Sequence, residues 1–220
     1  MSEQKIGLVP RLRFPEFREA GEWEETTLGQ NLSRQPEYGI NAPAVTYSDE
    51  LPTYLRITDI SDDGQIRQDQ KVSIAKKITD ENYLNAGDIV LARTGTSVGK
   101  AYKYRNEDGR LVFAGFLIRV RPDKSKINSE LLFQFLSTGK YWRWVAFTST
   151  RSGQPGINGT EYASLPIQLP PTLKEQEKIA ACLSSLDTLI AAQAEKLNAL
   201  KAHKKGLMQQ LFPSPEIVSG

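Results

Sequence analysis

The sequence predicts an α+β fold: an irregular, largely antiparallel domain over residues 1–170, a long coiled-coil helix over 171–213 and a tail over 214–220. Two observations favour it. Glycine and proline interrupt the first part throughout, and it shows no regular alternation of strands and helices, which argues against a doubly wound sheet. By contrast, Thr172–Phe212 contains no proline and a single glycine, and it is rich in Ala, Leu, Lys, Glu and Gln, the strong helix formers.

The first part contains several predicted elements. Thr53–Ile60 alternates apolar and polar residues and is rich in β-formers, Asp88–Arg93 has the composition of a buried strand, and Leu111–Val120 is a further strand, bent at Gly115. Ser129 is placed to cap a helix over the apolar residues that follow it. These elements indicate an antiparallel sheet with a small number of helices.

The long helix has clear signals at both ends. Thr172 stands three residues before Glu175, which is the spacing of a capping box, and Pro213 ends the helical pattern. At 1.5 Å per residue such a helix is ~60 Å long, whereas a body of its predicted size has a radius of gyration of ~15 Å. A helix of that length extends beyond its own domain, so we expect it to pack against a partner helix rather than only against its own domain.

The apolar residues of this helix form a heptad seam, with steps of three and four residues interrupted at Gln193 and Lys204. Gln193 lies near the middle of the helix, where it faces its own copy in an antiparallel pair. The predicted dimer interface consists of Ile179, Leu183, Leu186, Ile190, Gln193, Leu197, Leu200, Leu207 and Leu211.

Composition excludes several classes of protein. The chain has 220 residues, 39% of them hydrophobic and 25% charged, which is enough for a core, and it has one cysteine and one histidine. These counts exclude an intrachain disulfide and a zinc cluster, and His203 lies in a Lys-rich stretch unsuited to serving a nucleophile. No apolar run is long enough for a transmembrane helix and the N-terminus lacks the apolar core of a signal peptide, so we expect a cytoplasmic protein with no membrane association.

Charge is distributed unevenly although the net charge is only +2. Residues 93–121 contain seven basic residues against two acidic ones, and residues 131–160 contain no acidic residue at all. Arginine makes bidentate contacts with guanine edges and phosphates, so this pattern fits nucleic-acid binding. A solvated surface with scattered arginines accounts for the same pattern equally well.

Three segments resemble catalytic or metal-binding motifs only in part. Thr94–Lys100 resembles a phosphate-binding loop, but Thr94 occupies the place of the first glycine and Ala101 that of the magnesium-binding hydroxyl, so we expect a Gly-rich turn between two strands. Leu169–Thr172 lacks the amide and the aromatic residue of the amino-methyltransferase loop. Ser61–Gly64 has the composition of a turn rather than of a metal site. We therefore expect no catalytic residue, metal or cofactor.

Short segments spread along nearly the whole chain carry a family resemblance. They are Pro10–Pro15, Tyr38–Ile40, Tyr54–Ile60, Gly87–Gly95, Gln154–Asn158, Leu165–Pro171 and Lys205–Pro213. In this order they resemble the specificity subunits of type I DNA restriction–modification systems. The resemblance implies a non-catalytic chain whose residues 1–170 form a target-recognition domain that binds one half of a bipartite double-stranded DNA target.

The resemblance also implies partners. Methyltransferase subunits would dock on the chain, flip the target adenine and supply S-adenosylmethionine, and a restriction subunit would add ATP-driven translocation and cleavage. The usual family subunit has two recognition domains, each followed by a long helix, whereas this chain has one of each. It therefore resembles a complete half-length subunit that works as a homodimer or beside a second half-subunit; the remnant of a broken gene is the other reading.

Base reading needs Arg, Lys, Asn, Gln, Ser or Thr at exposed loops or element edges. By contrast, Asn158 has helix-cap spacing, and Tyr141, Trp142 and Trp144 favour the core or an interface. The predicted DNA-binding residues are Arg34, Tyr38, Arg93, Thr94, Thr96, Ser97, Lys100, Arg143, Arg151, Ser152 and Gln154.

Two other classes of function remain open from the sequence. One is a coiled-coil adaptor whose body binds protein, and the other is an orphan sequence-specific DNA-binding regulator. A steep fall of DNA affinity with salt separates the adaptor from the rest. Co-purification with a methyltransferase subunit separates the regulator from a specificity subunit.

Overall fold

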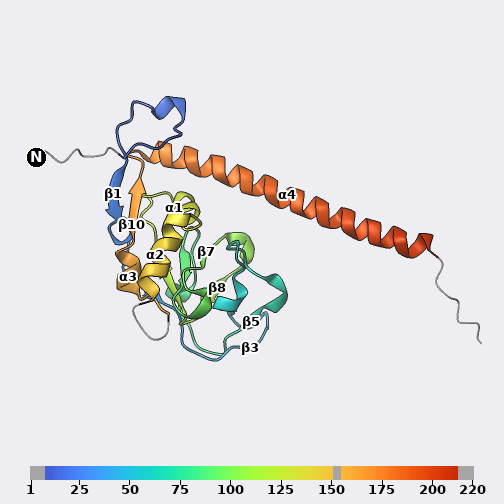
Figure 1. Ribbon diagram of the computed structural model, residues 1–220. Coiled ribbons are helices and arrows are strands. Elements are labelled where there is room, and N and C mark those ends of the chain that lie inside the picture. Colours follow the sequence, from blue (N-terminus) through green and yellow to red (C-terminus); the bar gives the residue numbers. More distant parts are fainter. Residues whose placement is uncertain (1–7, 151–154, 213–220) are drawn as a thin grey trace, which may run out of the picture. The chain divides into compact units, whose positions relative to one another are not determined.

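The computed structural model describes residues 8–150 and 155–212 (Figure 1). The chain divides into two units, one ending at Ala180 and the other beginning at Ala181. All the strands of the described chain belong to the first unit, together with three short helices and the first turns of the long helix. The helices are α1 (Ser129–Phe135), α2 (Gly139–Ser149), α3 (Gly159–Ala163) and α4 (Leu173–Leu211).

The strands are short and form three groups, as expected for an irregular, largely antiparallel fold. They are β1 (Glu24–Thr27), β2 (Glu37–Tyr38), β3 (Val45–Thr46), β4 (Thr53–Leu55), β5 (Val72–Ser73), β6 (Ile89–Ala92), β7 (Ala101–Lys103), β8 (Leu111–Phe113), β9 (Leu117–Val120) and β10 (Pro166–Leu169). The α+β fold class and the long C-terminal helix predicted from the sequence are confirmed.

The sheet that organises the first unit has the strand order β2-β9-β6-β7, and every neighbouring pair in it is antiparallel. Strand β6 lies at its centre, with Leu91 opposite Ile118 and Ala92 opposite Leu117 of β9. All residues of β6 and β9 are buried. Such a strand has apolar neighbours on both faces, which is why Asp88–Arg93 reads as a continuous apolar run rather than an alternating one.

A second sheet has the order β3-β5-β4-β8, and its β4–β8 pair is parallel. The predicted strand over Thr53–Ile60 is wrong beyond Leu55, because a 3₁₀ turn occupies Ile57–Asp59. The Asp59 carboxylate accepts a hydrogen bond from the Arg56 backbone N–H at 2.8 Å and pairs with the Arg56 guanidinium at 2.7 Å. These local bonds favour the turn over continuation of the strand.

The predicted strand over Leu111–Val120 is two strands. Its first part is β8 and its second part is β9, and the two belong to different sheets. The chain crosses between them at 114–116, where the Gly115 N–H donates to the Ile40 carbonyl at 2.9 Å. The expected bend at Gly115 is therefore a change of sheet. A third group, β1 paired antiparallel with β10, joins the start of this unit to the segment that leads into α4.

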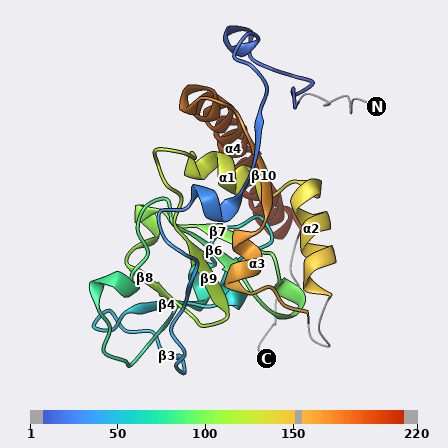
Figure 2. The same cartoon turned by 90° about the vertical axis from the view of Figure 1, so that its left-hand side faces the viewer.

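Two apolar cores lie on opposite faces of the β2-β9-β6-β7 sheet. One contains Leu91 and Ile118 and packs against α1, α2, α3 and β10. The other contains Val90 and Leu117 and packs against the second sheet. Figure 2 shows α2 and α3 on one side of β6 and β9, and β3, β4 and β8 on the other. The central sheet is thus the middle layer of the first unit.

The helices α1 and α4 each begin directly after a residue whose side chain caps the helix. The α1 helix is capped by Asn128, whose side chain accepts from the backbone N–H groups of Glu130 and Leu131, so the expected Ser129 cap is off by one residue. Thr172 caps α4 as expected, accepting from the Glu175 N–H at 3.3 Å. The Glu175 carboxylate is fully buried and accepts two hydrogen bonds of 2.7 Å from Arg13, which ties residues before β1 to the first turn of α4.

The expected seam residues of α4 fall into two groups. Ile179 packs against the core of the first unit. The apolar seam residues beyond Ala180 are between 37% and 73% exposed, and they are Leu183, Leu186, Ile190, Leu197, Leu200, Leu207 and Leu211. Pro213 lies outside the described residues. Within the described chain, no helix combines the length and the hydropathy that crossing a membrane requires.

Gly39 provides a test of the junction between β2 and β8. A Cβ atom at this position would overlap the Ala114 carbonyl, which is backbone and cannot rotate away. Gly39→Ala should lower the free energy of unfolding by about 1–3 kcal/mol, in the range of other overpacked sites. Chemical denaturation followed by tryptophan fluorescence measures the change.

The matched control is Gly206→Ala, because nothing lies within 4 Å of a Cβ atom there and the residue is inside α4. Alanine favours a helix over glycine by roughly 0.5–1 kcal/mol, so this variant should show the same or greater helix content by circular dichroism. Equal stabilities for Gly39→Ala and the parent would contradict the packing described for Gly39.

Candidate nucleic-acid interface

One end of the β6–β9 ladder carries an arginine and an exposed aromatic ring side by side. Arg93 follows the last residue of β6, and Phe116 precedes the first residue of β9. The Arg93 N–H donates to the Phe116 carbonyl at 3.0 Å, which extends the ladder by one step. Phe116 is 61% exposed. The buried ladder therefore sets the positions of two residues at the surface.

Tyr38 completes this cluster from the neighbouring strand β2. It lies opposite Ile118 of β9, which in turn lies opposite Leu91 of β6, so the three share one face of the sheet. Arg93, two residues after Leu91, continues that face, and its guanidinium carbon lies 4.9 Å from the centre of the Tyr38 ring. Such stacking is a cation–π contact.

The Tyr38 hydroxyl is held from the other side by α3. It accepts a hydrogen bond from the Gly159 backbone N–H at 3.0 Å. Asn158 caps α3 through a complete capping box with Glu161, with bonds of 2.8 and 2.9 Å, so the prediction that Asn158 is a cap is confirmed. The sequence proposed Tyr38 and Arg93 separately, and the structure brings them together.

Arg93 differs from the other basic residues of 93–121 in its partners. Among the described residues no acceptor receives a hydrogen bond from its guanidinium, and its Nε atom is buried. A buried donor without an acceptor costs about 1–3 kcal/mol. The ring of Tyr38 offsets part of this cost. A ligand that supplies an acceptor to the terminal Nη atoms would offset more of it.

The remaining six basic residues of this segment all have polar partners. The pairs are Lys100–Asp62, Lys103–Glu130, Arg105–Gln65, Arg110–Asp80, Arg119–Glu37 and Arg121–Glu37. Five of these six cations therefore lie beside a carboxylate, which two of them share, and Arg105 donates to a neutral amide. The acidic partners come from parts of the chain that charge counting along the sequence treats separately.

Arg119 shows why such pairing is required. Its side chain is 4% exposed, bonds Glu37 at 2.9 Å and donates to the carbonyls of Tyr83 and Glu81 at 2.8 and 3.0 Å. Burial lowers the pKa of this guanidinium, and Glu37 opposes that effect. Arg119 thus cross-links the sheet to residues 81–83 and is not available to a ligand.

The turn after Arg93 lies against the segment that follows α2. Thr94 pairs with Gly156 in an isolated β-bridge, and the Gly95 N–H donates to the Pro155 carbonyl at 3.2 Å. A 3₁₀ turn over Gly95–Ser97 precedes β7, so the expected Gly-rich turn between two strands is confirmed. Thr96 is exposed and Ser97 half-buried. Arg151, Ser152 and Gln154 lie outside the described residues.

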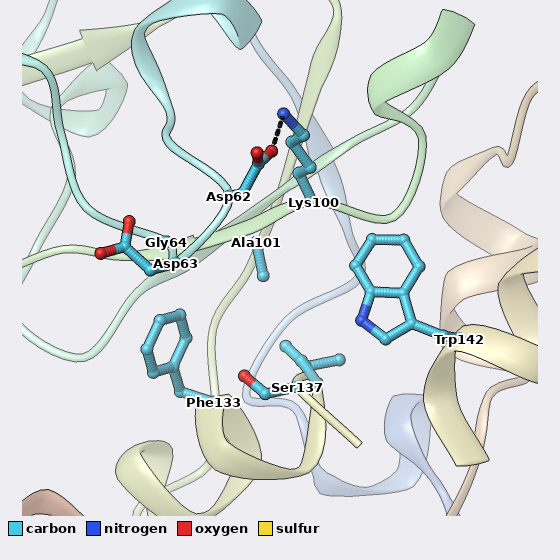
Figure 3. A pocket seen from close by; sticks show the side chains of 9 residues that line it. Asp62, Asp63, Gly64, Lys100, Ala101, Phe133, Ser137 and Trp142 are labelled. Carbon is cyan, nitrogen blue, oxygen red and sulfur yellow. Dashed lines mark ion pairs between the residues drawn. The ribbon is translucent and has the colours of Figure 1, made fainter. Parts of the chain in front are cut away.

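Lys100 closes the same turn, but its ammonium group pairs with Asp62 at 2.6 Å and lowers the pKa of that carboxyl. The two side chains meet beside a cavity of about 120 Å³ (Figure 3). Phe133, Ser137 and Trp142 also line it. The cavity is smaller than the ~300–1,000 Å³ of ordinary small-molecule sites, and its cation is already paired.

Two other candidates come from segments outside β2, β6 and β9. Arg34 is exposed in the connection before β2, and Arg143 is exposed on α2. Tyr141 is buried and donates to the Gly99 carbonyl at 2.7 Å, and Trp144 packs on the core, as expected for aromatic residues of this helix. Trp142 is 41% exposed and lines the cavity of Figure 3.

Sequence reasoning missed Phe116, because it placed this residue inside one strand over Leu111–Val120. The change of sheet at 114–116 brings its ring to the surface, and the neighbouring Gly115 was the available signal. Over the described ranges, no group of three histidine, cysteine or acidic side chains is arranged to hold a metal ion. The Ser61–Gly64 segment is a turn, with the Gly64 N–H donating to the Ser61 carbonyl at 3.1 Å.

A protein family described as the type I restriction modification DNA specificity domain matches residues 32–202. The chain belongs to this family. The matched range includes Tyr38, Arg93, Phe116 and most of α4. The resemblance inferred from short segments of the sequence is thereby confirmed, and the chain is identified with type I specificity subunits.

Two relatives come from Methanocaldococcus jannaschii. One, named "Putative type I restriction enzyme MjaX specificity subunit", is 32% identical over 157 residues, covering 70% of this chain and 36% of the relative. The type I restriction enzyme MjaVIII specificity subunit is 27% identical over 212 residues, covering 96% of this chain and 45% of the relative. The chain thus spans about half the length of these relatives or less.

Solved structures share the fold. The HsdS subunit from Thermoanaerobacter tengcongensis is 17% identical with a TM-score of 0.58, over 90% of this chain and 51% of that one. The S subunit of a type I restriction–modification system from M. genitalium is 16% identical with a TM-score of 0.57, over 88% of this chain and 46% of that one. At these identities the likeness concerns the fold alone.

Proposed function

We propose that this chain is a sequence-specificity subunit that binds one half of a bipartite double-stranded DNA target and has no catalytic centre of its own. Membership of the specificity-domain family over residues 32–202 supports the class. The observation that carries the position of the DNA contact is Arg93, whose guanidinium lies on Tyr38 without an acceptor in the described chain. Duplex DNA offers such acceptors on phosphates and base edges.

We propose that the partners are those of a type I complex. Methyltransferase subunits dock on the chain, flip the target adenine and supply S-adenosylmethionine, and a restriction subunit adds translocation and cleavage. The names of the relatives support this proposal, since both are specificity subunits of type I restriction enzymes. Specificity and catalysis then lie on different chains, in a cytoplasmic assembly.

The exposed seam of α4 supports pairing with another helix. Leu186, Ile190, Leu197 and Leu200 are between 50% and 66% exposed at heptad spacing. Leaving such a seam in water costs about 25 cal/mol per Å² of apolar surface, and a second helix removes that cost. We propose a homodimer through Thr172–Phe212, with pairing to a second half-subunit as the alternative.

Loss of Arg93 should weaken DNA binding. Arg93→Ala is expected to cost about 1–3 kcal/mol if the residue contacts a base, and about one unit of the salt slope if it contacts a phosphate. Fluorescence anisotropy with labelled duplexes at several salt concentrations measures both. Arg110→Ala is the matched control: it removes the same charge, but its guanidinium is paired with Asp80 and stacked on Tyr83.

An equal affinity of Arg93→Ala and the parent at moderate salt would show that the DNA contact lies elsewhere. A parent chain with no salt-dependent DNA binding would favour the adaptor function over the specificity subunit. These two results are distinguishable because the first requires binding by the parent.

Disrupting the seam should yield a monomer. Leu186→Lys with Leu200→Lys places two like charges in the expected interface, so the double variant should sediment as a monomer at tens of micromolar while the body stays folded. The control is Thr188→Lys with Ala202→Lys, on the opposite face of α4 by heptad spacing.

A homodimer also requires an interrupted palindromic target, because a two-fold axis repeats one half-site. A parent chain that is monomeric contradicts the homodimer.

The chain by itself should neither methylate DNA nor bind S-adenosylmethionine. The sequence has neither a Gly-rich cofactor loop nor the tetrapeptide that accepts a flipped adenine. Isothermal titration of the purified chain with S-adenosylmethionine tests this, and the same titration with the co-purified methyltransferase complex is the positive control. Saturable binding to the isolated chain would overturn the division of labour proposed above.

A further inference from the structure

We propose that Tyr38 is a positioning residue that orients the Arg93 guanidinium toward a guanine, so that the two residues together determine one base pair of the half-site. This inference rests on the proposed DNA-specificity function and names the base that the site reads. It concerns orientation, which is what separates base reading from a simple charge contact.

Tyr38 is restrained on three sides. Its backbone belongs to β2 and pairs with Ile118 of β9. The next residue, Gly39, passes so close to the Ala114 carbonyl that no side chain fits there, which fixes the path of the chain. The Tyr38 hydroxyl accepts from the Gly159 N–H at 3.0 Å. The ring is therefore a fixed surface although it is 51% exposed.

Arg93 is restrained at both ends. Its backbone N–H donates to Phe116 at 3.0 Å, and its carbonyl accepts from the Ile157 N–H at 2.8 Å. Its guanidinium lies over the Tyr38 ring, and the Nε atom is buried. Among the described residues no acceptor bonds the two terminal Nη groups, which form one edge that a ligand can approach. Two parallel donors match the O6 and N7 acceptors of guanine in the major groove.

The surroundings favour a base edge over a phosphate. A phosphate also accepts two parallel hydrogen bonds from a guanidinium, so the fixed guanidinium plane suits either ligand, and the neighbouring residue decides between them. Next to Arg93 stands the exposed ring of Phe116, an apolar neighbour for base edges and thymine methyl groups but not for a charged backbone. A phosphate contact is accordingly the competing outcome of the test.

The experiment selects duplexes from a randomised pool with the full chain and with Arg93→Ala, Tyr38→Leu, Tyr38→Phe and the Arg93→Ala/Tyr38→Leu double variant. Affinities are then measured for all four base pairs at each selected position. The parent should prefer guanine at one position by roughly 5- to 150-fold, the range of a bidentate arginine contact. Arg93→Ala and Tyr38→Leu should both reduce the preference for guanine at that position, and the double variant should reduce it no further.

Tyr38→Phe keeps the ring and loses only the hydroxyl bond to Gly159, so it should retain most of the preference. Arg110→Ala removes an arginine that is paired with Asp80 and stacked on Tyr83, and it should leave the preference at every position unchanged. Thermal denaturation of each variant checks folding, and partial exposure of Tyr38 makes its substitutions tolerable. Rescue by phenylalanine separates positioning from a general loss of structure.

Three results overturn the inference. An equal loss of affinity for all sequences in Arg93→Ala identifies a phosphate contact. If Tyr38→Leu keeps the full preference for guanine, the Tyr38 ring does not position Arg93. A parent chain that enriches no motif from the pool refutes the proposed function itself, and the inference with it, and this result differs from the first two because they require a motif from the parent.

Discussion

The antiparallel ladder between β6 and β9 is the constraint on which the rest of the first unit depends. All residues of Ile89–Ala92 and Leu117–Val120 are buried, so side chains on both faces of this pair need apolar neighbours. The helices cover one face and the second sheet covers the other. With both faces filled, the ladder can meet solvent only where it ends. There the strand register places Arg93 opposite Phe116. The position of the candidate interface is thus a consequence of core packing.

Ion pairing within the first unit reduces the number of arginines that are available at the candidate interface. A guanidinium as buried as that of Arg119 loses its hydration, and only carboxylates and carbonyls at 2.8–3.0 Å make its burial tolerable. Glu37 serves both Arg119 and Arg121, and it is also the residue immediately before Tyr38. This two-residue strand therefore places one carboxylate beside two arginines and an aromatic ring beside a third, Arg93. Arg93 differs from Arg119 and Arg121 because its partner is a ring and not an acid.

Local signals made some of these features predictable from the sequence, while others depend on contacts between distant residues. The strand at Asp88–Arg93, the Asn158 cap and the long helix follow from composition and spacing within a few residues. The end of β4 at Leu55 depends on the carboxylate of Asp59, four residues later, which the alternating pattern does not register. The crossing of 111–120 between sheets depends on Ile40, and the pairing of Lys100 depends on Asp62. The candidate site was therefore predicted as a set of residue types, and its geometry was not.

The energetics of recognition connect the Arg93 cluster with the seam of α4. One bidentate contact discriminates against a wrong base by about 1–3 kcal/mol, whereas specific DNA binding typically exceeds non-specific binding by about 4–10 kcal/mol. A single half-site read by few residues therefore falls short of useful specificity. Joining two recognition units through a helix makes the second contact intramolecular, and the discrimination of the two half-sites then adds. In the proposed dimer the exposed apolar seam of α4 would supply such a joint, and under the proposed function it complements the Arg93 guanidinium, for which the described residues provide no acceptor.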